Sequence, residues 1–310
     1  MVEAGITEAA AMAMLIEAMG ADPSLEEVAT IIVAIVDMHE AGLTPEHSLA
    51  LIKLHGELEG LGIARELFLE EFSTIASAMI DMAEAGITGD AAMAMIREAM
   101  KADPSLEEVA TITAAMVDMH EAGLTPEHSL ALLALRQELG IARELFLEEF
   151  STIASAMIDM AEAGITGDAA MAMIREAMKA DPSLEEVATI TAAMVDMHEA
   201  GLTPEHSLAL LALRQELGIA RELFLEEFST IASAVIDMVE AGITEAAAMA
   251  MIREAMKTDP SLEEVATIIA DKIDLVVEQP EPPVEQPEPP VEQPEPPVEQ
   301  PEPPVEQQEP

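Results

Sequence analysis

Apolar residues recur every three or four positions along most of the chain, with charged and small polar residues between them. One such stripe, starting at residue 106, has successive spacings of 3, 3, 4 and 3 residues, which places its members on one face of an α-helix. Runs of β-branched residues are sparse and no hairpin dipeptide joins alternating segments, so we expect an all-α protein. The stripe consists of Leu106, Val109, Ile112, Met116 and Met119.

One short phrase separates the helical segments. The sequence E-A-G-[IL]-T occurs seven times, and its residue order is typical of a helix end followed directly by a helix start. Gly123 suits the left-handed position that closes a helix, and Leu124 suits the apolar position that packs back on it. Thr125 is a favoured N-cap and Pro126 a favoured first helical residue. A connection this short joins antiparallel helices. The seven glycines are Gly5, Gly42, Gly86, Gly123, Gly164, Gly201 and Gly242.

A unit of 78 residues is repeated along the chain, with copies that start near residues 22, 103, 181 and 259. The copies 103–180 and 181–258 differ at five positions only, and each divides into halves of 41 and 37 residues that both carry the turn phrase. The basic unit is therefore a helical hairpin of about 40 residues. Hairpins that contact only their neighbours stack into an α-solenoid, here with about fourteen helices. The likeness to HEAT-type and armadillo repeats is architectural, because the sequence carries no family signature.

Four helices are expected within the copy 103–180. The first has two candidate starts: Asp103 as N-cap with Pro104 after it, or Ser105 and Glu108 as a capping box. The second is expected to stop at Gly140. The expected ranges are about Asp103–Glu121, Thr125–Leu139, Ile141–Ala163 and Thr166–Lys179.

Phenylalanine and methionine supply the large core side chains. Phe146 and Phe150 lie one turn apart, and Met171 and Met178 fall on an apolar stripe, so we expect them in the core. Met173 lies off that spacing, and we expect it to line a groove. The alternative for the 23 methionines is an adaptable binding surface.

The two ends of the repeat array differ in character. Asp271 and Lys272 replace an apolar pair of the second copy, which would stop further stacking on that face. Near the other end Ile16 stands where a later copy has Arg175. We therefore expect that end to associate more readily with other protein surfaces.

Composition changes completely after residue 276. Residues 277–304 are four copies of V-E-Q-P-E-P-P, and this proline-rich segment, which extends to residue 310, is expected to form an extended polyproline II tail. The predicted organisation is thus a helical repeat domain over 1–276 and a tail over 277–310. The tail is interpreted as a spacer arm, with a ligand for a polyproline-binding module as the alternative.

Charge restricts the classes of partner. The chain has 61 acidic and 13 basic residues, a formal charge of −48, which disfavours nucleic acid and anionic membranes and favours a basic protein partner. No uncharged run approaches the ~18–20 residues that cross a bilayer, and no basic segment precedes an apolar one at the start. We therefore expect a soluble protein without membrane insertion or signal peptide, in a compartment that the sequence does not define.

Histidines flanking the turn phrase are the candidate metal ligands. His120 and His128, with Glu121 and Glu127 beside them, could together bind Zn²⁺ or Ni²⁺. The alternative is that they serve as ordinary residues at helix ends. Paired glutamates could attract Ca²⁺, but no calcium-loop motif is present and no cofactor is expected. The six candidate ligands are His39, His47, His120, His128, His198 and His206.

Catalytic motifs give no support to an enzyme. The chain has no phosphate-binding glycine loop, no nucleophile elbow, no H-E-x-x-H motif and no cysteine. We expect a non-enzymatic acidic scaffold that binds a protein partner through several equivalent sites. The alternative is a structural protein that self-associates or binds divalent cations.

Overall fold

The computed structural model describes residues 1–20, 24–58, 63–258, 262 and 264–277, and every regular element in these ranges is an α-helix. This confirms the predicted all-α class. The fifteen helices of the described residues are α1 (Glu8–Gly20), α2 (Leu25–Glu40), α3 (Pro45–Leu58), α4 (Arg65–Glu70), α5 (Phe72–Glu84), α6 (Gly89–Ala102), α7 (Val109–Glu121), α8 (Pro126–Leu139), α9 (Arg143–Glu162), α10 (Gly167–Ala180), α11 (Val187–Glu199), α12 (Pro204–Leu217), α13 (Arg221–Glu240), α14 (Glu245–Thr258) and α15 (Val265–Val277).

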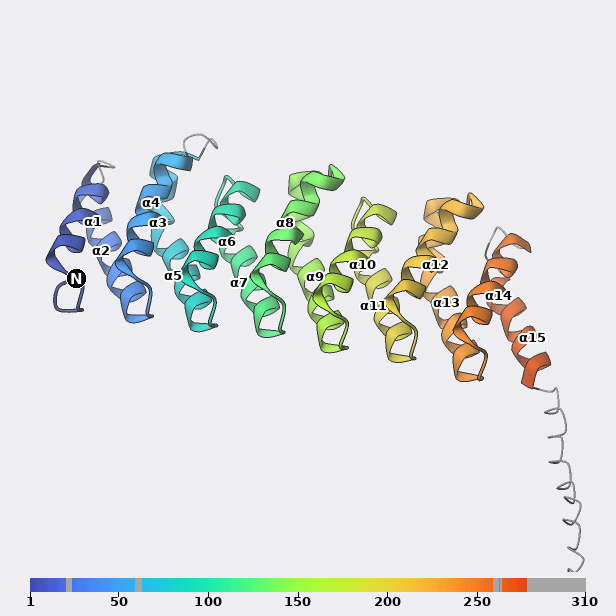
Figure 1. Ribbon diagram of the computed structural model, residues 1–310. Helices are drawn as coiled ribbons and strands as arrows, with labels where there is room; N and C mark the ends of the chain where they lie inside the picture. The colour runs from blue at the N-terminus through green and yellow to red at the C-terminus, as the bar shows by residue number, and fades with distance from the viewer. Residues whose placement is uncertain (21–23, 59–62, 259–261, 263, 278–310) are drawn as a thin grey trace, which may run out of the picture.

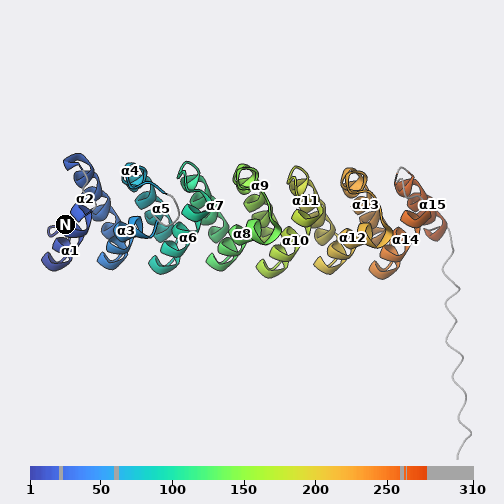
Figure 2. The ribbon, with the colours of Figure 1, turned by 90° about the horizontal axis from the view of Figure 1, so that it is seen from above.

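The helices form antiparallel hairpins stacked side by side in one nearly straight row (Figure 1). Seen from above, the row has two layers (Figure 2). Layer A contains α1, α3, α6, α8, α10, α12 and α14, and layer B contains α2, α4, α5, α7, α9, α11, α13 and α15. Helices contact their hairpin partner and the adjacent helices of their own layer. This arrangement is the α-solenoid that the repeat predicts.

The predicted turn is present in every copy. All seven glycines of the phrase have a positive φ, between 84° and 94°. At the fourth of the seven turns the Gly123 N–H donates to the His120 carbonyl (2.9 Å) and the Leu124 N–H to the Met119 carbonyl (3.0 Å). These two bonds define a Schellman motif, and the Leu124 side chain is buried against the hairpin. The chain therefore reverses with its helix-end carbonyls satisfied.

The start of α7 differs from both predicted starts. Leu106 has a φ of 64°, and the chain turns there so that its side chain enters the core before the helix begins at Val109. Asp103 is 2% exposed, and its carboxylate accepts from the Ser105 N–H (3.1 Å), the Ser105 hydroxyl (2.5 Å) and the Glu108 N–H (2.7 Å). Hydrogen bonds to the buried Asp103 carboxylate thus hold residues 103–108 in a turn, where the sequence predicted the first turn of a helix. The same arrangement recurs at Asp181.

The first copy uses the capping box instead. Ser24 accepts from the Glu27 N–H (3.2 Å), and the Glu27 carboxylate accepts from the Ser24 N–H (2.5 Å), so α2 begins at Leu25. One repeat sequence therefore supports two ways of starting the same helix.

A second difference raises the helix number from the expected fourteen to fifteen. Residues 65–84 and 143–162 have the same sequence, yet the former divides into α4 and α5 at Glu71 whereas the latter is the single helix α9. The connection before α4 is three residues longer than its counterpart before α9. Because the local sequence is identical, residue type within 65–84 does not by itself determine the break at Glu71.

The core lies between the two layers and contains the predicted apolar stripe. Phe146 and Phe150 are buried with their rings edge to face at 5.7 Å, and Met171 and Met178 are buried as expected. The prediction that Met173 lines a groove is wrong, since its exposed fraction is 0%. α10 packs against α8 and α12 in its layer and against α9 and α11 behind, so it buries a wider arc than one stripe.

The predicted boundary between repeat domain and tail falls at the last residues of α15. α15 ends at Val277, and the expected tail over 278–310 lies outside the described residues. The Asp-Pro pairs at 22–23 and 259–260 also lie outside them.

The turn glycines provide a first stability prediction. Gly123→Ala places a Cβ at a φ of +89° and should destabilise the fold by about 1 kcal/mol, measured as a lower chemical-denaturation midpoint. Gly56→Ala is the matched control, because Gly56 lies inside α3 in open space without a positive φ. It should stabilise by about 0.5–1 kcal/mol. Equal signs for the two substitutions would contradict the assigned role of Gly123.

The buried aspartates provide a second prediction. Asp103→Ala leaves the Ser105 and Glu108 N–H groups without their acceptor and should cost about 2 kcal/mol of unfolding free energy. Adding Asp181→Ala should about double the loss, because the two sites are independent. Asp118→Ala removes an exposed aspartate from the same repeat and should stay within about 0.5 kcal/mol of the parent. Similar losses for Asp103→Ala and Asp118→Ala would exclude the capping role.

Candidate interaction surface

Negative charge is concentrated on one of the two layers. The helices of layer A contain 14 acidic and 9 basic residues, a net charge of −5, whereas those of layer B contain 24 acidic and 4 basic residues, a net charge of −20. The side of the rod formed by layer B is therefore the candidate surface for a cationic partner.

Six of the nine cations on layer A helices pair with carboxylates of the same layer. Arg175 on α10 donates to Glu138 on α8 at 3.1 Å, and the same pairing joins neighbouring layer A helices in the other copies. These pairs are partly exposed, so each contributes little stability. Their effect is to neutralise layer A locally. The equivalent pairs are Arg97–Glu57 at 3.1 Å and Arg253–Glu216 at 3.3 Å.

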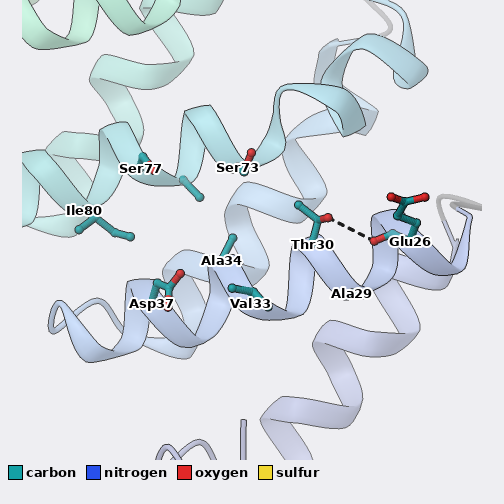
Figure 3. Close-up of a pocket in the computed structure, with 10 residues that line it drawn as sticks. Glu26, Ala29, Thr30, Val33, Ala34, Asp37, Ser73, Ser77 and Ile80 are labelled. Atoms are coloured by element: carbon teal, nitrogen blue, oxygen red, sulfur yellow. Dashed lines mark hydrogen bonds between the residues drawn. The ribbon is translucent and has the colours of Figure 1, made fainter.

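Shallow grooves run between neighbouring helices of layer B. The groove between α5 and α7 and the groove between α9 and α11 each have a volume of about 290 Å³. Their lining residues correspond one to one at a spacing of 78 residues, and most are Ala, Ser or Thr. A related groove of about 380 Å³ lies between α2 and α5 (Figure 3). The α9–α11 groove is lined by Thr152, Ser155, Ala156, Asp159, Ala188, Thr191, Ala192, Val195 and Asp196.

Carboxylates stand at the end of each groove. Asp81 and Asp118 belong to the α5–α7 groove, and Asp159 and Asp196 to the α9–α11 groove. In the α2–α5 groove Asp37 lies at the far end of the α2 wall from Glu26 (Figure 3). A small, neutral floor that ends in carboxylates suits a lysine or arginine side chain, whose aliphatic stem packs while its charge meets the acid.

The sequence interpretation did not identify these groove residues. The available signal was the run of small residues on the solvent face of layer B helices, such as Ser155 one turn and Thr152 two turns before Asp159. Small residues at exposed helix positions carry no hydrophobic pattern. Only the packing of two adjacent helices shows that they form a floor.

The first histidine of each turn folds back on its own loop. In α7 the Nδ1 atom of His120 lies 3.2 Å from the Leu124 carbonyl oxygen, and His39 and His198 repeat this contact with Leu43 and Leu202. Donation from Nδ1–H to this carbonyl supports the tight turn.

The second histidine completes the next helix start. The His128 Nδ1 accepts from the Thr125 N–H at 3.0 Å, as a capping-box residue does, while its Nε2 lies 3.5 Å from Asp168 on α10. His47 makes the equivalent contacts with Thr44 and Asp90. In the third copy the Nδ1 of His206 accepts from the Thr203 N–H and lies 3.5 Å from Glu245.

Metal binding by the six turn histidines stays a prediction. The two histidines of a turn have separate hydrogen-bond partners, and in the described ranges no group of three or more His, Asp or Glu is arranged to hold a metal ion.

Carboxylates at helix starts remain ionised into more acidic solution. The Glu127 backbone N–H and the Thr125 hydroxyl lower the pKa of the Glu127 carboxyl, and the Thr203 hydroxyl and the Glu205 backbone N–H lower the pKa of Glu205. On layer B the Glu144 backbone N–H and the Arg143 guanidinium lower the pKa of Glu144.

Comparison with known proteins finds no family model that matches this chain and no similar curated protein. Among the helices of the described residues, none combines the length and the apolar character needed to cross a bilayer.

A glycine under the histidine ring generates a further prediction. A Cβ at Gly167 would overlap the His128 imidazole, which is hydrogen-bonded to Thr125. The ring can shift, because in the third copy Glu245 occupies this position and His206 still accepts from the Thr203 N–H. Gly167→Ala should therefore cost less than about 1 kcal/mol. The double variant Gly167→Ala, His128→Ala should lose less than the sum of its single variants, measured as a double-mutant cycle. Additive effects would show that the ring does not constrain this position.

Proposed function

We propose that this protein is a non-enzymatic α-solenoid scaffold that binds a basic protein partner along layer B. The partner's lysine or arginine side chains would occupy the grooves between layer B helices. The proline-rich tail would act as a spacer arm, and catalysis is not part of the proposed function.

The strongest support is the repetition of the same groove. The α5–α7 and α9–α11 grooves have equivalent lining residues and volumes, and they lie on the same side of one straight row. A partner with several basic segments could occupy both at once, which raises avidity without any new type of contact. Charge concentrated on the same layer would accelerate association with such a partner.

The test uses peptides with one or three Lys/Arg clusters joined by flexible Gly/Ser linkers, with binding measured by fluorescence anisotropy. The three-cluster peptide should bind at least about tenfold more tightly than the one-cluster peptide. Its affinity should fall as NaCl is raised, because exposed charges are screened. Equal affinities for the two peptides would exclude multivalent binding.

Matched variants separate the grooves from general charge. The triple variant Asp118→Asn, Asp159→Asn, Asp196→Asn removes three groove carboxylates of layer B, and it should weaken binding about tenfold if each contributes about 0.5 kcal/mol. The control triple variant Glu46→Gln, Glu127→Gln, Glu205→Gln removes the same charge from layer A helices. It should weaken binding less than about threefold. An equal loss in both would contradict the assignment to layer B.

A further inference from the structure

The first hairpin has an apolar face that no other part of the described chain covers. Met12, Ile16 and Met19 lie one helical turn apart on α1 and are 56%, 65% and 66% exposed. Val2 is also 55% exposed. α1 stands at the end of the row (Figures 1 and 2), with α3 on only one side of it in layer A.

The repeat shows what happens to this face elsewhere. Met171 and Met178 on α10 are the counterparts of Met12 and Met19, and they are 6% and 1% exposed. They lie one turn either side of Arg175, which reaches Glu138 of α8, so this face of α10 is the one turned towards α8. The exposed face of α1 is therefore the surface that an additional layer A helix buries in every internal copy.

Because of one substitution, a helix with the sequence of α8 would fit the exposed face of α1 poorly. Ile16 replaces Arg175, which pairs with Glu138 of the covering helix α8 at 3.1 Å. A covering helix of this type would place its glutamate against Ile16 and leave the carboxylate without a partner. The chain has no Lys or Arg before Lys53, so no neighbouring cation can compensate. The occupant must be apolar and uncharged at this position.

We propose that α1 of a second copy of this chain covers the face, in a symmetric end-to-end dimer. A two-fold contact places Met12, Ile16 and Met19 against the same residues of the second copy, so the apolar stripe meets itself and Glu8, one turn before Met12, lies at its edge. The two rods then extend in opposite directions, which keeps most of their negative charges far apart. Because the contact is isologous, assembly stops at two.

An apolar groove of about 450 Å³ beside the patch can receive a methionine side chain of the second copy. It is lined by Met1, Val2, Glu8, Ala11, Met12, Leu15 and Ile32. A patch of a few large side chains is smaller than the ~800 Å² per partner of a standard interface, so the expected dimer is weak, with a Kd on the order of micromolar.

Sedimentation velocity of the full chain, over about 1 to 500 µM protein, tests the proposal. We expect a concentration-dependent monomer–dimer equilibrium that NaCl strengthens several-fold between about 50 and 500 mM, because salt screens the repulsion between acidic ends and leaves apolar contacts intact. Binding of a basic peptide to layer B should weaken with salt, so failure of the dimer and failure of the proposed function are distinguishable. A monomer at every concentration, or oligomers that grow beyond two, would overturn the proposal.

Two glutamate variants locate the contact. Ile16→Glu adds a charge at an exposed position of α1 and should raise the dimer Kd at least about tenfold without lowering helix content. Val33→Glu is the matched control, because Val33 is 60% exposed but lines the α2–α5 groove on layer B. It should change the Kd less than about threefold. Equal effects of the two variants would refute the assigned surface.

Disulfide trapping provides an independent measurement, since the chain has no cysteine. Ile16→Cys should give covalent dimers under mild oxidation much faster than Val33→Cys at the same concentration. Equal rates would count against the symmetric contact.

Discussion

Closing each helix with a glycine at positive φ and an apolar residue immediately after it is the constraint on which the remaining structure depends. The Leu124 N–H and the Gly123 N–H satisfy the last carbonyls of α7, and the Leu124 side chain anchors the turn in the core. Thr125 and Pro126 then start α8 without an intervening loop. Because the reversal takes so few residues, the two helices of a hairpin must pack antiparallel, and successive hairpins must lie side by side. The two layers, and with them the separation of charge, follow from this geometry.

Charge separation is a property of the layers and not of the repeat as a linear sequence. The 61 acidic residues are spread along the chain and the 13 basic residues lie among them from Lys53 onward, but the short turns send consecutive helices to opposite layers. The basic residues lie mostly on layer A helices, where pairs such as Arg175–Glu138 neutralise charge between neighbours. Layer B keeps its carboxylates without comparable cations, beside grooves with small side chains. A cationic partner would therefore distinguish the two sides of one rod.

The parts of this fold that could be predicted from sequence are those set by local chemistry. Gly123 and Gly140, the cap at Thr125 and the buried Phe146 each follow from residue type and spacing. The start of α7 could not be derived, because the capping role of Asp103 depends on its burial, and burial depends on packing. Identical sequences that form a broken helix at Glu71 and a continuous α9 show the same limit. The grooves and the buried Met173 were missed because both arise only when neighbouring helices are in place.

Equal spacing of the copies at 103 and 181 has a consequence for how such a chain can change over generations. Removal or duplication of one 78-residue unit by recombination between these two near-identical segments would join equivalent surfaces. Every hairpin would then still pack against a hairpin of the same sequence as before. Rod length can therefore vary in whole steps while every contact is preserved. Each step would add or remove one groove of the α9–α11 type, so the length of the rod and the number of its grooves would change together.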